Sequence, residues 1–220
     1  MRSKMTVITT ISLVVFAFAL ASEALAKNGG TTVVWGEVEA DLEPFCTIVP
    51  PATSCSFAEP DAEGRAEHRT KTHKGLLERD EFKARLEIPI PNGLGIDETN
   101  AATADIRLIL THPAFDTTPA MDYAECFFKF KGTETEEEDG LMQTKAHYAV
   151  DIRSRLNKRG GPGLRELKGT CDIDLGTMGI QPGVPDAQDG DLATAVLVTD
   201  NPDPTMPDTR TSFLQGMFED

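Results

Sequence analysis

The feature that most constrains the fold is an apolar alternation with a period of two, which recurs along the chain while no helical period does. This period is typical of β-strands, whose successive side chains point to opposite faces of a sheet. The segments that carry it, or that form a short apolar run, are residues 34–42, 84–90, 104–110, 146–152, 193–199 and 213–218. Trp35 interrupts the alternation of the first segment. The pattern therefore predicts a protein built from strands.

Turn-forming sequences such as Pro91-Asn92-Gly93 and Gln181-Pro182-Gly183 separate these segments. Strands at this density predict an all-β fold, an antiparallel sandwich of the immunoglobulin-like type, with a small β-barrel as the alternative. We expect inserted loops or local helix at residues 60–80 and 113–121. We also expect a solvated hairpin loop at the five-acid cluster of residues 134–139.

The first 26 residues have the pattern of a secretion signal. Arg2 and Lys4 precede an apolar run over residues 5–21, and Ala24-Leu25-Ala26 matches the small-x-small cleavage site. An uncleaved membrane anchor is the alternative, although the run is near the short limit for a membrane span. We expect cleavage before Lys27, export to a periplasm or the cell exterior, and no membrane span in the mature protein. Residues 27–220 then form a single domain, long enough to bury a core.

Four cysteines lie after the predicted cleavage site, and an even count in an exported chain favours disulfides. Cys46 and Cys55 bracket a short segment and are predicted to pair. Cys126 and Cys171 each share an apolar face with alternating neighbours, so a bridge across two strands or two sheets is feasible.

Charge limits the range of partners. The chain has 21 Lys and Arg against 36 Asp and Glu, which gives a formal net charge of −15. Affinity for nucleic acid depends on neutralising phosphates with cations, so nucleic acid is excluded as the expected partner. Residues 65–85 are locally basic, and Arg65, Arg69, Lys71 and Lys74 form a candidate docking patch for a protein or an envelope component.

The best candidate for a metal site is the segment that contains Asp186, Asp189 and Asp191, because calcium prefers several carboxylate oxygens. The segment does not follow the EF-hand register, and Asp and Gly are also preferred turn residues. Ordinary turn chemistry is therefore the preferred interpretation, and no other cofactor is predicted.

The sequence contains no catalytic signature. It lacks Gly-x-Ser-x-Gly, His-Glu-x-x-His and the phosphate-binding Gly-rich loop. His68 and His73 lie among cations that would oppose a metal ion. Paired carboxylates could hydrolyse glycosides, but with so many acids this signal has no specificity.

Taken together, these features predict an exported, non-enzymatic β-module that binds a partner or contributes to envelope structure. It would dock through the basic patch or an exposed strand edge. Two alternatives remain: a secreted hydrolase with a carboxylate site, and a calcium-stabilised extracellular module.

Overall fold

A computed structural model describes residues 33–44, 47–49, 52–54, 61–138, 140–156, 162–174, 176 and 179–220. The predicted signal segment, residues 1–26, and the predicted Cys46–Cys55 pair lie outside the described residues. Within the described residues, no helix has the length and apolar character needed to cross a membrane.

The regular elements of the described chain are strands apart from one turn of 3-10 helix, so the predicted all-β fold is confirmed. The elements are β1 (Val33–Pro44), β2 (Thr47–Val49), β3 (Ala52–Ser54), β4 (Glu63–His73), β5 (Leu76–Ile90), η1 (Ala101–Thr103), β6 (Asp105–His112), β7 (Met121–Phe127), β8 (Lys129–Glu138), β9 (Leu141–Leu156), β10 (Pro162–Lys168), β11 (Thr170–Asp174), β12 (Ile180–Pro182), β13 (Leu192–Thr199) and β14 (Thr209–Met217). All six segments selected by the alternation lie mainly in strands.

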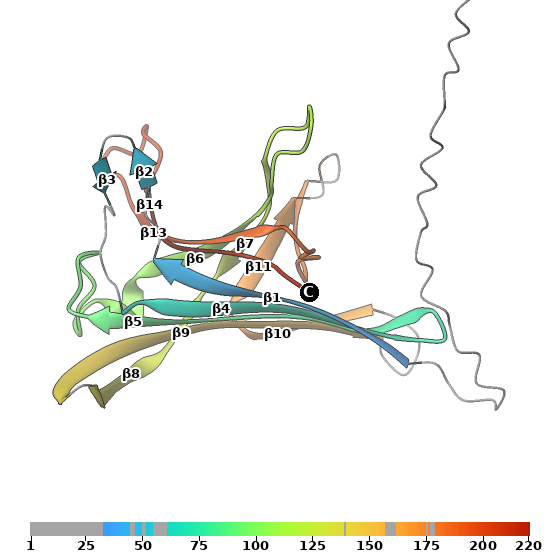
Figure 1. The fold of residues 1–220 in the computed structure, drawn as a ribbon, viewed down its shortest axis with the longest axis horizontal. Coiled ribbons are helices and arrows are strands. Elements are labelled where there is room, and N and C mark those ends of the chain that lie inside the picture. The colour runs from blue at the N-terminus through green and yellow to red at the C-terminus, as the bar shows by residue number, and fades with distance from the viewer. Residues whose placement is uncertain are drawn as a thin grey trace, which may run out of the picture. The chain divides into compact units, whose positions relative to one another are not determined.

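Twelve of these strands form one curled antiparallel sheet (Figure 1). The order is β10-β9-β5-β4-β1-β14-β13-β6-β7-β11-β12, and β8 pairs with β9 beside β10. We call β1, β4, β5, β8, β9 and β10 the β5 half, and β6, β7, β11, β12, β13 and β14 the β13 half. Strands β2 and β3 form a separate two-stranded sheet.

Strand β1 joins the two halves. It pairs with β4 from Val33 to Leu42 and then with β14 at Glu43 and Pro44. An immunoglobulin-like sandwich keeps two separate sheets. Here the hydrogen-bonded ladder continues through β1 from one half to the other, so the sandwich is not confirmed.

The chain also crosses between the halves at Gly169. Strand β10 pairs with β9 in the β5 half, and after one residue β11 pairs with β7 in the β13 half. Gly169 has a φ of +60°, and a Cβ at this position would lie 2.2 Å from the backbone oxygen of Phe127. Only glycine fits both the left-handed conformation and this close approach.

The core fills the inside of the curl and takes side chains from both halves. The Phe82 ring of β5 lies 6.4 Å from the Phe218 ring between centroids. The Tyr148 hydroxyl of β9 donates to the Ala101 carbonyl at 2.9 Å, and burial raises the pKa of Tyr148 to about 12. The largest other side chains with almost no exposure are Leu42, Leu86, Ile88, Ile106, Leu108, Leu110, Val150, Ile152 and Leu214.

The predicted Cys126–Cys171 disulfide is confirmed. The two residues are directly opposite each other on β7 and β11, and both are fully buried. The alternation correctly placed Cys126 and Cys171 on inward faces, and the register of β7 against β11 pairs them.

Two expectations for the connecting segments were wrong. In the segment 60–80, the described residues 61–80 are not an insertion or a helix, because β4 and the start of β5 occupy most of them. The inward face of β4 carries Ala66 and His68, which give no apolar alternation. The acidic cluster is also a strand rather than a loop: Glu134, Glu136 and Glu137 lie in β8 and pair with β9. Residues 113–120, by contrast, form a connection between β6 and β7 without helix, as the loop alternative expected, and Phe115 and Thr118 form an isolated bridge there.

The crossing at Gly169 gives a stability prediction. Gly169→Ala should destabilise the fold by about 1–3 kcal/mol more than Gly75→Ala, because only the first substitution adds a steric clash. Gly75, in the β4–β5 turn, has a φ of +75°, and a Cβ there would have no atom within 4 Å, so it carries the conformational cost alone. Urea denaturation of both variants checks this, and equal losses would contradict the tight crossing.

Candidate functional site

The predicted basic patch lies on the outer face of the β5 half, and acidic partners already pair with most of it. Arg65 forms an ion pair with Glu39. The Arg69 Nε donates to Glu37 Oε1 at 2.6 Å, and this bond lowers the pKa of Glu37. The structure therefore brings the cations of β4 against the carboxylates of β1.

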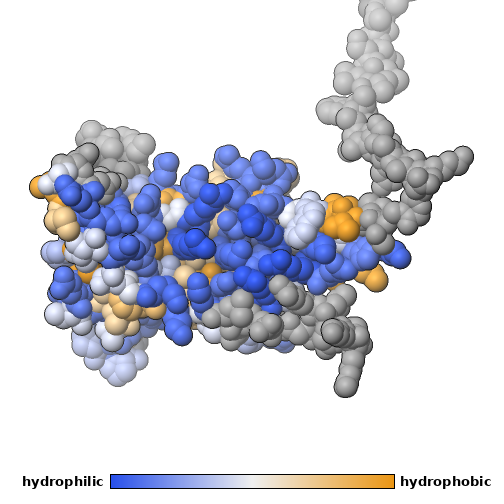
Figure 2. All heavy atoms as spheres, turned by 90° about the horizontal axis from the view of Figure 1, so that it is seen from below, coloured by the Kyte–Doolittle hydropathy of each residue, from blue (hydrophilic) through white to orange (hydrophobic). Residues whose placement is uncertain are grey.

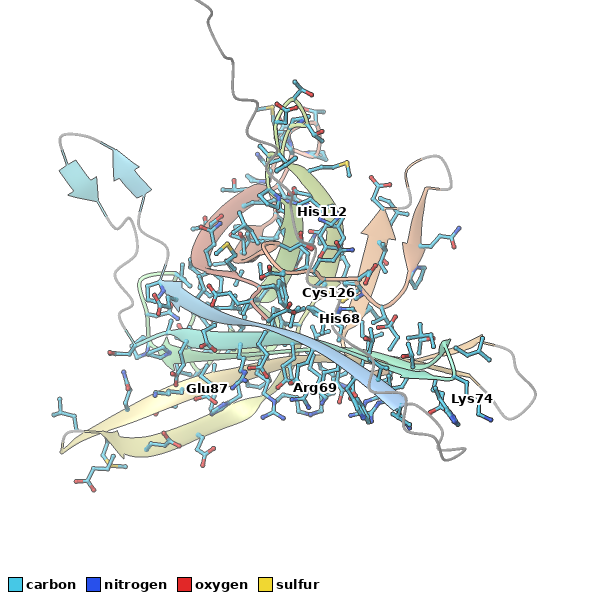
Figure 3. All side chains as sticks on the ribbon, turned by 45° about the vertical axis from the view of Figure 1, so that its right-hand side comes forward. His68, Arg69, Lys74, Glu87, His112 and Cys126 are labelled. Atoms are coloured by element: carbon cyan, nitrogen blue, oxygen red, sulfur yellow. A yellow bond between two sulfur atoms is a disulfide. The ribbon has the colours of Figure 1, made fainter. Side chains whose placement is uncertain are left out.

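The remaining two members of the patch are not gathered with the first two. Lys71 Nζ lies 2.9 Å from Glu78 Oε2 across the β4–β5 hairpin. Lys74 is exposed at the tip of that hairpin, away from Arg69 (Figure 3). Figure 2 shows that the surface formed here is largely hydrophilic. The sequence could not reveal the pairing, because it gives no register between β1 and β4.

The calcium candidates do not form one cluster. Asp186 and Asp189 are exposed, whereas Asp191 is buried, with 4% of its surface accessible. No group of three or more His, Cys, Asp or Glu side chains is placed to hold a metal ion within the part of the chain that the structure describes. Calcium binding by these residues stays a prediction.

Asp191 instead forms a hydrogen-bonded cluster with buried Tyr123 and partly exposed His112, which sequence analysis missed. His112 Nδ1 lies 2.7 Å from Asp191 Oδ1, and the Tyr123 hydroxyl donates to Oδ2 at 3.0 Å. The Gln188 backbone N–H donates to the same oxygen at 3.0 Å. The His112 and Tyr123 rings stack at 4.1 Å between centroids. Burial is the main cause that raises the pKa of Tyr123, and the negative charge of Asp191 raises it further.

This cluster fixes the end of the loop that precedes β13. No short-range motif connects its members, because Tyr123 and His112 are 68 and 79 residues from Asp191 in the sequence. No signal in the sequence could therefore have placed the three side chains together.

A second histidine holds the same loop from the opposite half. His68 of β4 is 5% exposed and points inward (Figure 3). Its Nδ1 lies 2.9 Å from the Ala187 carbonyl oxygen and its Nε2 lies 2.8 Å from Asp80 Oδ1. Both partners are acceptors, so the doubly protonated ring satisfies both contacts. Burial lowers the pKa of His68, but the bonds to Asp80 and Ala187 outweigh it and raise the pKa above its usual value.

The clearest candidate docking feature is a side of β1 with which no described residue pairs over its first half. Glu39 exchanges two backbone hydrogen bonds with Glu219, at 3.0 and 2.9 Å. Because backbone groups alternate sides along an antiparallel strand, those of Val33, Trp35 and Glu37 point to the same side as Glu39. Among the described residues, nothing pairs with them there.

Three apolar side chains along this edge are exposed to solvent. Val33, Val34 and Trp35 are 43%, 56% and 59% exposed. The ammonium of Lys71 lies 5.5 Å from the centroid of the Trp35 ring. A solvent-facing tryptophan on the outer face explains why Trp35 interrupts the apolar alternation. We call Val33–Val38 of β1, on its side away from β4, the open edge.

An acidic groove of about 640 Å³ continues from the open edge along β1 and the C-terminal segment. Its lining residues are Glu37, Glu39, Asp41, Glu43, Gln215, Gly216, Met217, Glu219 and Asp220. Arg69 and Arg65 pair with Glu37 and Glu39, but no described cation lies within ion-pair distance of the other four carboxylates. The groove therefore has a net negative charge.

Comparison with protein family models, with curated proteins and with solved structures finds no match to this chain. The function is therefore argued from the open edge, the acidic groove and their surroundings.

The His68 contacts predict a pH dependence of stability. The folded-state pKa is above the unfolded value near 6.5, so the stabilisation is complete below that value and is lost as the pH rises through the folded pKa. His68→Gln should lower the free energy of unfolding by about 1–3 kcal/mol at low pH, because buried acceptors lose their donors.

Urea denaturation of the wild type and His68→Gln across this range measures the difference directly. His73→Gln serves as the matched control, because His73 is the last residue of the same strand. A wild-type-to-variant difference that does not shrink with rising pH would contradict the assigned protonation of His68.

Proposed function

We propose that the protein is an exported, non-enzymatic β-module that binds its partner by strand addition at the open edge of β1. One observation carries the proposal. Among the described residues, nothing pairs with the backbone groups of Val33, Trp35 and Glu37 on the side of β1 away from β4. The side chains of Val33, Val34 and Trp35 are exposed beside them. An extended peptide gains affinity from such backbone groups and specificity from the neighbouring side chains.

A second edge of the sheet provides a contrast that favours β1. Among the described strands, β8 pairs with β9 alone, and it carries Lys129, Lys131 and several glutamates along its length. Charged side chains of this kind discourage edge-to-edge pairing. The open edge has Val33, Val34 and Trp35 instead, which makes it the better surface for an added strand.

The disulfide supports export. A buried Cys126–Cys171 bridge fits an oxidising compartment. The secretion signal at residues 1–26 and the mature domain from Lys27 belong to the same proposal, as does a sandwich-like packing of the β5 and β13 halves. Calcium stabilisation and carboxylate hydrolysis remain the two alternatives that the sequence leaves open.

The proposal predicts that short extended peptides of randomised sequence, selected against the mature protein, will include binders that protect β1. Hydrogen exchange should slow at the Trp35 and Glu37 amides when such a peptide binds, because these N–H groups gain acceptors. If the selection yields no peptide that protects these amides, strand addition at the open edge is contradicted.

A proline substitution separates binding from folding. The Glu37 N–H points to the open edge and not to β4, so Glu37→Pro removes a docking donor without removing a ladder bond. We expect peptide binding to weaken by at least about tenfold, since a hydrogen bond is lost and the ring obstructs the partner.

Glu37→Gln is the matched control, because it removes the same charge and keeps the N–H. Circular dichroism and thermal melting of both variants verify that the sheet is intact. Equal binding by the proline variant and the wild type would place the partner elsewhere on the protein.

A further inference from the structure

Resting on the proposed function, we propose that the partner strand alternates basic and apolar residues and runs antiparallel to β1. Its basic side chains would lie on the outer face at the mouth of the acidic groove. Its apolar side chains would lie on the inner face, against Val34 and Val38. The proposal rests on the direction of the neighbouring segment and on the different chemistry of the two faces of β1.

The direction follows from the segment already paired with β1. Glu219 pairs with Glu39 in antiparallel orientation, and β14 pairs with Glu43 and Pro44 in the same orientation. These contacts occupy the edge of β1 beyond Val38. An added strand on Val33–Val38 that continues this row of hydrogen bonds is antiparallel to β1, which is also the slightly more stable pairing.

The outer face selects for cations. Glu37 follows Trp35 on this face, and Glu39, Asp41 and Glu43 extend the row along the groove. Glu219 and Asp220 approach from the other side, and no described cation pairs with them. A Lys or Arg side chain beside Glu37 would therefore enter a region with surplus negative charge.

The inner face selects for apolar side chains. Val38 is 9% exposed and belongs to the core, whereas Val34, which precedes it on the same face, is 56% exposed. Cross-strand neighbours on one face pack against each other. An apolar residue of the added strand would cover Val34 and extend the core toward the beginning of β1.

Synthetic peptides of equal length test this chemistry. One alternates Lys and Val, the second alternates Ser and Val, and the third alternates Glu and Val. We expect the Lys peptide to bind roughly three- to tenfold more tightly than the Ser peptide at low salt, because each exposed ion pair contributes weakly. The advantage should shrink as the salt concentration rises, and the Glu peptide should bind most weakly.

A double variant identifies which carboxylates are responsible. Glu219→Gln with Asp220→Asn should remove most of the difference between the Lys and Ser peptides. The control is Glu136→Gln with Glu137→Gln on β8, which changes the net charge equally but lies outside the groove. Equal effects of the two double variants would mean attraction to the acidic protein as a whole and would overturn the groove assignment.

The remaining outcomes distinguish this inference from the proposed function. Equal binding of the Lys and Ser peptides, with protection of Trp35 and Glu37, would overturn the basic partner and leave strand addition intact. No protection by any peptide would contradict both. Protection of these amides in the free protein would overturn both as well, since the chain would then cover its own edge. A dimer detected by sedimentation and lost in Glu37→Pro would assign the edge to a second copy and overturn the basic partner.

Discussion

The backbone pairing of β1 with strands on both sides is the interaction on which the rest of the structure depends. β1 pairs with β4 over ten residues and reaches β14 only at its last two positions and, through Glu39, the C-terminal segment. This arrangement joins the β5 and β13 halves and lets their side chains share one core. Within the described part of the chain, it also leaves the beginning of β1 paired on one side only. The open edge thus results directly from the change of pairing partner along β1, from β4 at its beginning to β14 at its end.

The alternation in the sequence was enough to predict the class of fold, because half-buried strands produce that pattern directly. It located segments of β1, β5, β6, β9, β13 and β14, and it paired Cys126 with Cys171 correctly. It failed at β4, where Ala66 and His68 line the inner face and charged side chains cover the outer face. It also failed at β8, whose glutamates have no apolar alternation. Strands of this kind are held by their neighbours, so their own composition does not identify them.

The candidate site could not have been found from the sequence, because its parts come from long-range pairing. The basic patch looked available until the register of β1 against β4 placed Glu37 and Glu39 beside Arg69 and Arg65. The aspartates proposed for calcium were separated by burial, since Asp191 turned inward to His112 and Tyr123. Strand edges are equally invisible in sequence. Whether a strand has one neighbour or two depends on the order of strands in the sheet.

The pairing of β1 with β14 also has a consequence for the order of folding. Glu43 and Gln215 are direct partners although they are 172 positions apart in the sequence. Contacts between such distant residues are slow to form, because a long loop must be closed first. The acidic groove contains residues from both ends of this pairing, so it cannot exist before β14 has docked. A chain in which β14 has not yet docked therefore has no groove to offer, even where β1 and β4 are already paired.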